Sequence, residues 1–391
     1  MSKVYQNPSS FSTPFIHIYN NLLLFFLKFA HFLPFDFIKS LPIICLSIAS
    51  KESVIFSDLA SFISPKLNID FDSSIRNISR FFSNPNYDFD FFYSKFISHI
   101  LSSFKIKHLD KRVHISVDHG DVEDRFTVLM FSLKIGKQCI PIFFKSFSFH
   151  NKEAYSFDLF KEGLNFCHNL IKFIDNDSNI IFLADRFWST HFKFMGYIES
   201  LGDTYNIRTK SNTIAFVYDN KEKHTIKKPL FALNPKQYHS KFFENISISF
   251  KHYSTNLAIS KIDTHKEPFY ILTNGSPKRA IKDYTYRFGS IEFLFKSFKS
   301  NGFFLEETQI TNLYSFNSLY TCLCINHVLF TMIGIDYSKN RNCYKYKIRN
   351  SRIVNGKRRK EHSFFHIGLI LLNAALDGVV RIFQRFILYD V

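Results

Sequence analysis

The sequence predicts an α/β protein in which a central β-sheet lies between two helical regions. Apolar residues recur at helical spacings near both ends of the chain, whereas short apolar runs alternate with helical stretches in the middle. The expected parts are a helical N-terminal region (1–108), the first part of the core (109–210), a β-rich insertion (211–273), a core helix (274–310) and a basic, mostly helical C-terminal region (311–391).

Two short helices are expected in the N-terminal region. Ser57–Ile63 opens the first, and after a loop containing Pro65 the stretch Asp72–Phe82 opens the second. The second helix carries Arg76 and Arg80 on a polar face, which is the layout of a helix-turn-helix offering its second helix to DNA. A solvated face of an ordinary bundle helix explains these residues equally well, so both interpretations stay open.

The core begins with three strands joined by short turns. Apolar and polar residues alternate over 113–117, which predicts a strand that ends at Asp118. Phe126–Leu133 and Cys139–Phe144 follow as two further strands. Because the connections are too short for a crossover, these three strands are expected to form an antiparallel meander.

Helices and strands then alternate. A helix is expected over Lys152–Phe173, a buried parallel strand over Ile180–Ala184, a helix over His191–Ser200 and a strand over Tyr205–Arg208. This order of elements resembles the ribonuclease H-like fold of polynucleotidyl transferases.

The remaining chain predicts a β-rich insertion followed by helices. Its expected strands are Ile214–Val217, Ile246–Phe250, Asn256–Ile259 and Phe269–Leu272. One long amphipathic helix is expected from Pro277 to Lys299, and an apolar helical run from Phe364 to Leu376.

The charge balance favours a polyanionic partner. Lys and Arg total 50 against 33 Asp and Glu, for a net charge of +17. Nucleic acid is the first candidate and an acidic membrane surface the second. No membrane span is expected near the N-terminus, because Lys28 and Pro34 interrupt its apolar stretch. The segment 339–360 carries ten Lys and Arg residues, which indicates a phosphate-tracking surface or, alternatively, a disordered basic tail.

Six scattered cysteines show neither the paired spacing of a zinc site nor the density of a disulfide scaffold. Cys322, Cys324 and His327 lie in an apolar helical run, so we expect them to be buried core residues. Trp188 is also expected in the core, rather than stacked on an unpaired base.

Three carboxylates are placed where they can act together. Asp118 and Asp185 follow neighbouring strands, and Glu292 lies on the helix expected to pack across the sheet. Metal-dependent phosphodiester cleavage needs such convergence, since two ions roughly 4 Å apart must be held. Asp121 and Asp124 are alternatives to Asp118, but they lie in the following turn.

The helix around Glu292 also carries Tyr284, Arg287 and Lys299. On a continuous helix, Lys299 and Tyr284 lie near the face of Glu292. An acid beside two cations suits metal ligation next to phosphate contacts. The alternative is a solvated helix face with intrahelical ion pairs.

This stretch resembles the Tyr-x2-Arg-x3-Glu-x6-Lys signature of the IS-four family of bacterial insertion-sequence transposases. Leu183–Trp188 is similar to that family's second-aspartate strand, Ser116–Asp118 to the first, and Tyr205–Lys210 to the strand that follows. The resemblance spans roughly residues 50–375. One departure is that four residues separate Arg287 from Glu292, where the family has three; a loosened helix turn would restore their facing.

The resemblance implies a cut-and-paste DDE transposase with a ribonuclease H-like core. Asp118, Asp185 and Glu292 would hold two Mg²⁺ ions, for which Mn²⁺ substitutes. The expected DNA contacts are Arg186, Tyr284, Arg287 and Lys299 near the cleavage point, and Arg76 and Arg80 in the N-terminal region.

The partners implied are double-stranded DNA, as terminal inverted repeats and target, and a second copy of the chain in a synaptic homodimer, without a membrane. The implied location is the bacterial cytoplasm, with the nucleoid. Two alternatives remain: a metal-dependent nuclease on the same fold that does not join strands, and a catalytically inactive DNA-binding descendant.

Overall fold

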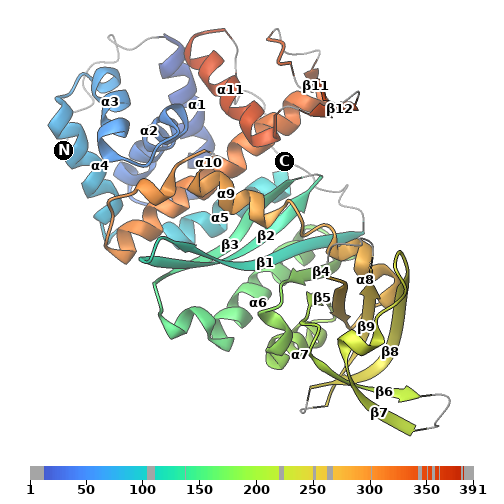
Figure 1. The fold of residues 1–391 in the computed structure, drawn as a ribbon. Helices are drawn as coiled ribbons and strands as arrows, with labels where there is room; N and C mark the ends of the chain where they lie inside the picture. Colours follow the sequence, from blue (N-terminus) through green and yellow to red (C-terminus); the bar gives the residue numbers. More distant parts are fainter. Residues whose placement is uncertain are drawn as a thin grey trace.

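The computed structural model describes residues 13–103, 111–136, 138–219, 224–249, 252–261, 267–300, 302–341, 346–349, 351–354, 357–360, 362–379 and 382. A helical bundle lies at one end of the molecule, a mixed β-sheet crosses its middle, and a narrow β extension forms the other end (Figure 1). The prediction of a mixed α/β protein is confirmed.

One sheet of ten strands organises the described residues, in the order β3-β2-β1-β4-β5-β10-β9-β8-β6-β7. Its strands are β1 (Arg112–Val122), β2 (Phe126–Ile135), β3 (Gln138–Ser148), β4 (Asn179–Ala184), β5 (Thr204–Arg208), β6 (Ile214–Asp219), β7 (His224–Pro229), β8 (Ser240–Ile248), β9 (Tyr253–Ser260) and β10 (Phe269–Thr273). The predicted meander of β1, β2 and β3 is confirmed, as is the parallel pairing of β4 with β1; β5 is in turn parallel to β4.

The first strand was expected to end at Asp118, but it continues to Val122. Its antiparallel pairing with β2 extends as far as Val122 opposite Phe126, whereas its parallel pairing with β4 stops at Val117 opposite Ala184. Asp118 therefore lies where β1 loses one of its two neighbours, which leaves room for side chains at that edge.

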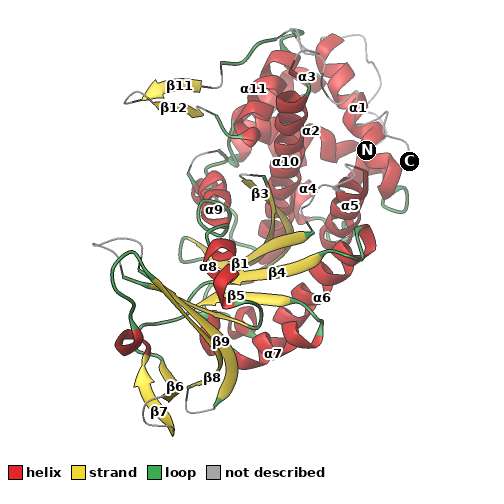
Figure 2. Ribbon diagram, turned by 90° about the vertical axis from the view of Figure 1, so that its right-hand side faces the viewer, coloured by secondary structure: helices red, strands yellow, loops and turns green. Residues whose placement is uncertain are grey.

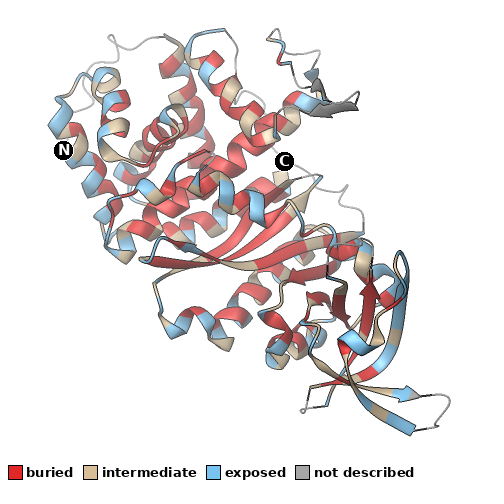
Figure 3. Cartoon of the chain, viewed as in Figure 1, coloured by how far each residue is buried: buried red, intermediate tan, exposed pale blue. Residues whose placement is uncertain are grey.

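The β-rich insertion is not a separate module. Strand β10 pairs antiparallel with β5, with Ile271 opposite Arg208, so the insertion extends the core sheet. Strand β7 was not predicted, because its residues are largely polar and partly or fully exposed. Figure 3 shows the buried residues concentrated in the middle of the sheet and in the helical bundle, with β6 and β7 more open to solvent.

The helical bundle is built from helices of both the N-terminal and the C-terminal region, which pack together. Its helices are α1 (Thr13–Ala30), α2 (Phe35–Lys51), α3 (Phe56–Leu67), α4 (Phe71–Ser83), α5 (Phe89–Ser103), α10 (Leu313–Lys339) and α11 (Phe364–Leu376). Helix α10 runs through the bundle beside α2, α4, α5 and α11 and also packs on β3 (Figure 2). It is long and apolar enough to cross a membrane, but nearly all of its apolar stretch is buried inside the molecule, as in a core helix.

Glycines allow α10 and α11 to approach closely. A Cβ atom on Gly334 would lie 1.9 Å from the carbonyl oxygen of Phe364, and one on Gly368 would lie 2.0 Å from that of Phe330. Both positions therefore exclude any larger side chain.

The helices α3 and α4 match the predicted pair, with one correction. Pro65 lies inside the last turn of α3, so the connecting loop is 68–70 instead. Asp70 caps α4 by accepting a hydrogen bond of 2.9 Å from the Ser73 amide. Arg76 and Arg80 are exposed, and the opposite face of α4 is buried in the bundle.

Helix α6 (Phe157–Ile174), which the 3₁₀ turn Lys152–Tyr155 precedes, packs on β3, and α7 (Phe192–Ser200) packs on β5. The expected single helix from Pro277 to Lys299 is wrong, since the structure has two, α8 (Pro277–Tyr284) and α9 (Ile291–Lys299). A turn over 285–290 separates them, and Gly289 adopts φ +70° in it. That left-handed conformation interrupts a helix and suits glycine.

The basic segment 339–360 includes the strands β11 (Ser351–Val354) and β12 (Lys357–Lys360), which pair antiparallel. The C-terminal region is thus not wholly helical. Tyr344 and Lys345 lie outside the described residues.

Candidate active site

Asp118 and Asp185 lie side by side where the parallel pairing of β1 with β4 ends. The last paired residues of the parallel strands β1 and β4 are Val117 and Ala184, so the two aspartates are the next residues of their strands. The His119 amide donates to Asp118 Oδ1 at 3.0 Å, and the Phe187 amide donates to Asp185 Oδ1 at 3.0 Å. Backbone amides therefore orient both carboxylates.

The alternatives to Asp118 do not share this place. Asp121 accepts a hydrogen bond of 2.7 Å from Thr127 Oγ1 farther along β1, and Asp124 is exposed in the turn to β2. The preference for Asp118 agrees with this geometry.

Arg287 links the first and third carboxylates. It lies in the turn between α8 and α9, and its guanidinium donates to Asp118 Oδ2 at 2.5 Å and to Glu292 Oε1 at 3.4 Å. Only 5% of Arg287 is exposed. Because Arg287 lies in this turn and not on one continuous helix with Glu292, its guanidinium contacts Glu292 although four residues separate them.

The electrostatics of the site show how closely these groups interact. Burial raises the pKa of Asp118 to about 6; Arg287 opposes the shift, while Asp185 and Glu292 add to it. Burial works against the charge of Arg287, but the surrounding acidic groups, led by Asp118, raise its pKa. The carboxylates therefore repel one another, and Arg287 partly compensates them.

Carboxylate oxygens are the ligands that Mg²⁺ and Mn²⁺ prefer, so the donor chemistry of the three acids fits such an ion. Their arrangement is not that of a preformed metal site. Among the described residues, no group of three His, Cys, Asp or Glu side chains lies close enough together to hold a metal. Instead Arg287 pairs with Asp118 and Glu292, and the Glu292 side chain is 58% exposed.

A second group of polar residues borders the first. Glu267 forms an ion pair with Arg186, which follows Asp185, and lies 3.7 Å from Arg208 at the end of β5. Arg208 also stacks over the Phe269 ring, 4.9 Å from its centroid. Neither Arg208 nor Glu267 was predicted as a site residue. Arg208 is the last residue of a predicted strand and could have been found, whereas no local pattern marks Glu267.

Tyr284 is buried at the C-terminal end of α8. Burial raises the pKa of its hydroxyl to about 12, although Arg287 and Arg208 oppose the shift. The hydroxyl thus stays protonated at neutral pH beside the charged cluster.

The other predicted DNA contacts lie elsewhere. Lys299, in the last turn of α9, pairs with Glu306 at 3.4 Å. Arg76 and Arg80 lie on α4 in the helical bundle. The structure therefore brings together Asp118, Asp185, Glu292, Arg186, Tyr284 and Arg287, but not Lys299, Arg76 and Arg80.

Core predictions near the site are confirmed. Trp188 is fully buried and stacks against the His119 ring, with 5.4 Å between centroids. Cys322, Cys324 and His327 are buried in α10. His119 thus joins the Trp188 core to the strand that carries Asp118.

Comparison of the sequence with models of known protein families gives no match, and comparison with curated proteins gives none either. The function must therefore be inferred from the site itself. The site combines the carboxylates of Asp118, Asp185 and Glu292 with Arg287, which pairs with two of them, and with Arg186, which follows Asp185.

Proposed function

We propose that this chain is a DNA transposase of the DDE class, similar to the IS-four family, with a ribonuclease H-like core. The observation that carries the proposal is the approach of Asp118, Asp185 and Glu292, from three different elements, to Arg287. Asp118 and Asp185 follow the paired parts of two parallel strands and Glu292 lies on α9, and charged groups with perturbed pKa values gather in this way preferentially at functional sites.

The three carboxylates would hold two Mg²⁺ or Mn²⁺ ions, whose chemistry is activation of an oxygen nucleophile and stabilisation of the leaving oxygen. The chain's own residues prepare the site for this. With a pKa of about 6, Asp118 is largely ionised above pH 7. The amides of His119 and Phe187 orient the two aspartates. Arg287 compensates part of the negative charge of Asp118 and Glu292, and DNA and metal would compete with it for these two carboxylates.

Phosphate binding is assigned to the arginines beside the carboxylates. Arg186, Arg208 and Arg287 present guanidinium groups that match phosphate oxygens in geometry and charge. Tyr284, whose hydroxyl stays protonated, is suited to donate a hydrogen bond to a phosphate or sugar oxygen. Contacts of this kind position DNA without reading its sequence.

The remaining basic surface would hold the rest of the duplex. Arg76 and Arg80 on α4, Lys299 on α9 and the β11–β12 hairpin all carry positive charge, and the chain as a whole is at +17. Paired cleavage of two transposon ends calls for a homodimer on the DNA. The proposed setting is the bacterial cytoplasm, where the nucleoid supplies terminal repeats and target.

The test is excision and joining of a supercoiled plasmid that carries the DNA flanking the coding sequence. Native protein is compared with Glu292→Gln and with Glu307→Gln, a matched control at an exposed glutamate. We expect metal-dependent excision and strand transfer in the native protein and the control, and loss of both in Glu292→Gln with DNA binding retained.

Other outcomes separate the alternatives. Equal cutting by Glu292→Gln contradicts the assignment of the third carboxylate. Cutting without joining favours a metal-dependent nuclease. DNA binding without cutting by any variant favours an inactive descendant, for which the ion pairs of Arg287 with Asp118 and Glu292 would be the resting arrangement.

A further inference from the structure

One face of β1 is polar along the stretch that leads to Asp118. Val113, Ile115 and Val117 are fully buried in the apolar core, so the residues between them project from the opposite face of the strand. The residues on that opposite face all contact the segment 283–290, which ends α8, forms the turn with Arg287 and precedes α9; they are Arg112, His114, Ser116 and Asp118.

These contacts hold the segment 283–290 at both ends. At its start, the Asp283 carboxylate pairs with Arg112 and lies 3.1 Å from His114 Nε2. At its end, the hydroxyl oxygens of Ser290 and Ser116 lie 3.4 Å apart. Arg287, which donates to Asp118, lies between these two anchored positions.

The ion pairs of Asp283 link α8 to a distant part of the sheet. Helix α8 packs on β9 and β10, where Ala280 and Tyr284 belong to a small apolar cluster. Strands β4 and β5 separate β10 from β1 in the sheet. Asp283 therefore extends the contacts of α8 to the strand that carries Asp118.

Asp283 carries its charge inside the protein. The residue is only 6% exposed, and burial alone would raise its pKa, but the contacts with His114 and Arg112 outweigh burial and lower the pKa below its usual value. A buried charge is costly unless it is paired, and removing one partner of such a pair is strongly unfavourable. Asp283 is thus held firmly to Arg112 and His114 at neutral pH.

Backbone hydrogen bonds connect Asp283 to Arg287. The Tyr286 amide donates to the Asp283 carbonyl oxygen at 3.0 Å, and the Arg287 amide donates to that of Tyr284 at 3.0 Å. The Ser290 hydroxyl in turn donates to the Arg287 carbonyl oxygen at 2.8 Å. A displacement of Asp283 is therefore passed on to Arg287.

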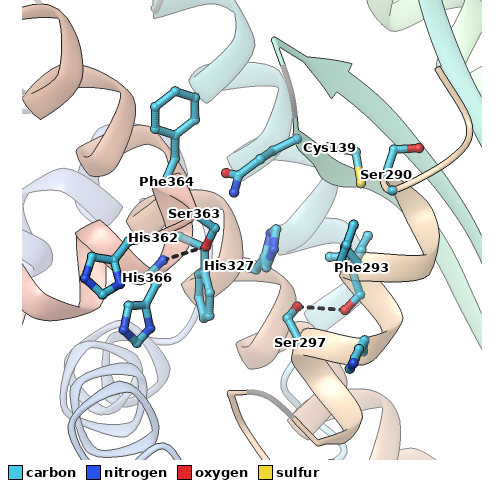
Figure 4. A pocket seen from close by; sticks show the side chains of 14 residues that line it. Cys139, Ser290, Phe293, Ser297, His327, His362, Ser363, Phe364 and His366 are labelled. Carbon is cyan, nitrogen blue, oxygen red and sulfur yellow. Dashed lines mark hydrogen bonds between the residues drawn. The ribbon is translucent and has the colours of Figure 1, made fainter. Parts of the chain in front are cut away.

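Packing from the other side contributes little to the placement of the turn. A cavity of about 630 Å³ borders Gly289 and Ser290, and Phe293 and Ser297 of α9 lie along it (Figure 4). Phe293 is 64% exposed. The contacts with β1 are therefore important for the position of Arg287.

We propose that Asp283 is a positioning residue of the candidate active site. By holding the end of α8 on β1, it places the Arg287 guanidinium against Asp118 and Glu292. The inference deepens the proposed function and rests on it for the role of Arg287 toward a DNA phosphate, but the placement of Arg287 can be measured without DNA. Asp283 acts through Arg287 and takes no part in the chemistry itself.

The test is nuclear magnetic resonance of the full chain with isotope-labelled arginine, in which Arg287→Leu identifies the Arg287 signal. The Nε atom of Arg287 is buried, so its hydrogen should exchange slowly with water in the native protein. In Asp283→Asn we expect exchange at least about tenfold faster, because release of the turn exposes the guanidinium.

Asp203→Asn is the matched control. Asp203 is 3% exposed and pairs with His168 at 2.8 Å, so this change weakens a buried pair of the same kind that holds α6 to the start of β5. The exchange of Arg287 should stay at the native rate in this variant. If Asp283→Asn does not fold, Arg112→Met carries the test, since the Arg112 side chain is 30% exposed and its loss should be milder.

The proposal is overturned if Asp283→Asn and Arg112→Met leave the exchange of Arg287 unchanged. It is also overturned if Asp203→Asn accelerates the exchange as much as Asp283→Asn, because both pairs would then act only through the stability of the fold. Faster exchange in Asp283→Asn alone supports the positioning role, even if the plasmid assay shows no excision and the proposed function fails.

Discussion

Replacing Asp118 with Asn is expected to stabilise the protein at neutral pH. The pKa of Asp118 rises from 3.8 to about 6 in the folded state, which corresponds to about 3 kcal/mol at roughly 1.4 kcal/mol per pKa unit. The ionised carboxylate therefore lowers the free energy of unfolding by this amount above pH 6. Because 21% of the side chain is exposed, solvent screening reduces the expected gain to about 2 to 3 kcal/mol.

The sign of the effect fixes its pH dependence. Below about pH 4 the carboxyl is protonated in the folded and the unfolded chain, so the native protein and the Asp118→Asn variant should be equally stable. Between about pH 4 and 6 the carboxyl ionises more readily in the unfolded chain, and the advantage of the variant should grow. Asparagine has the shape of the neutral acid and can still accept the hydrogen bond from the His119 amide.

The assay is urea unfolding of both proteins in EDTA at several pH values. Asp124→Asn, which changes an exposed carboxylate in the turn after β1, is the matched control and should shift stability by less than about 0.5 kcal/mol. A variant that is less stable than native protein at pH 7.5, or a gain that is as large near pH 4, would refute this reasoning.

Further predictions follow from Arg287 and the glycines. Arg287→Leu should destabilise the fold by about 3 kcal/mol at pH 7.5, because it leaves Asp118 and Glu292 uncompensated, and by less near pH 5, where Asp118 is protonated; equal losses in urea unfolding at both pH values would contradict this. Gly334→Ala should lower stability by about 2 kcal/mol or more in thermal unfolding, since its Cβ would lie 1.9 Å from the Phe364 carbonyl oxygen. The control Gly196→Ala, with no atom closer than 3.9 Å, should be neutral or stabilising.

The strand framework could be predicted because its signal is local. Alternation over 113–117 and the apolar run before Asp185 identify β1 and β4 directly, and short connections identify the meander. The neighbourhood of Asp118 and Asp185 then follows from parallel pairing, as the register of β1 with β4 confirms.

Other features depend on contacts between distant residues and were not predictable. The amphipathic pattern continues through 285–290, so the break between α8 and α9 is visible only from Gly289 and from the contacts of Arg287 with Asp118. The pairing of Arg186 with Glu267 joins residues far apart in the sequence. The addition of β10 to the edge of β5 likewise depends on backbone pairing that no side-chain pattern specifies.

Binding of Mn²⁺, followed by electron paramagnetic resonance, tests the convergence of the three carboxylates most directly, because it requires no knowledge of the DNA sequence. We expect saturable binding by the native chain and by Asp124→Asn, and at least about tenfold weaker binding by Asp118→Asn, Asp185→Asn and Glu292→Gln, since each removes one ligand. Unchanged Mn²⁺ affinity in these three variants would contradict a shared metal site, and with it the proposed transposase mechanism.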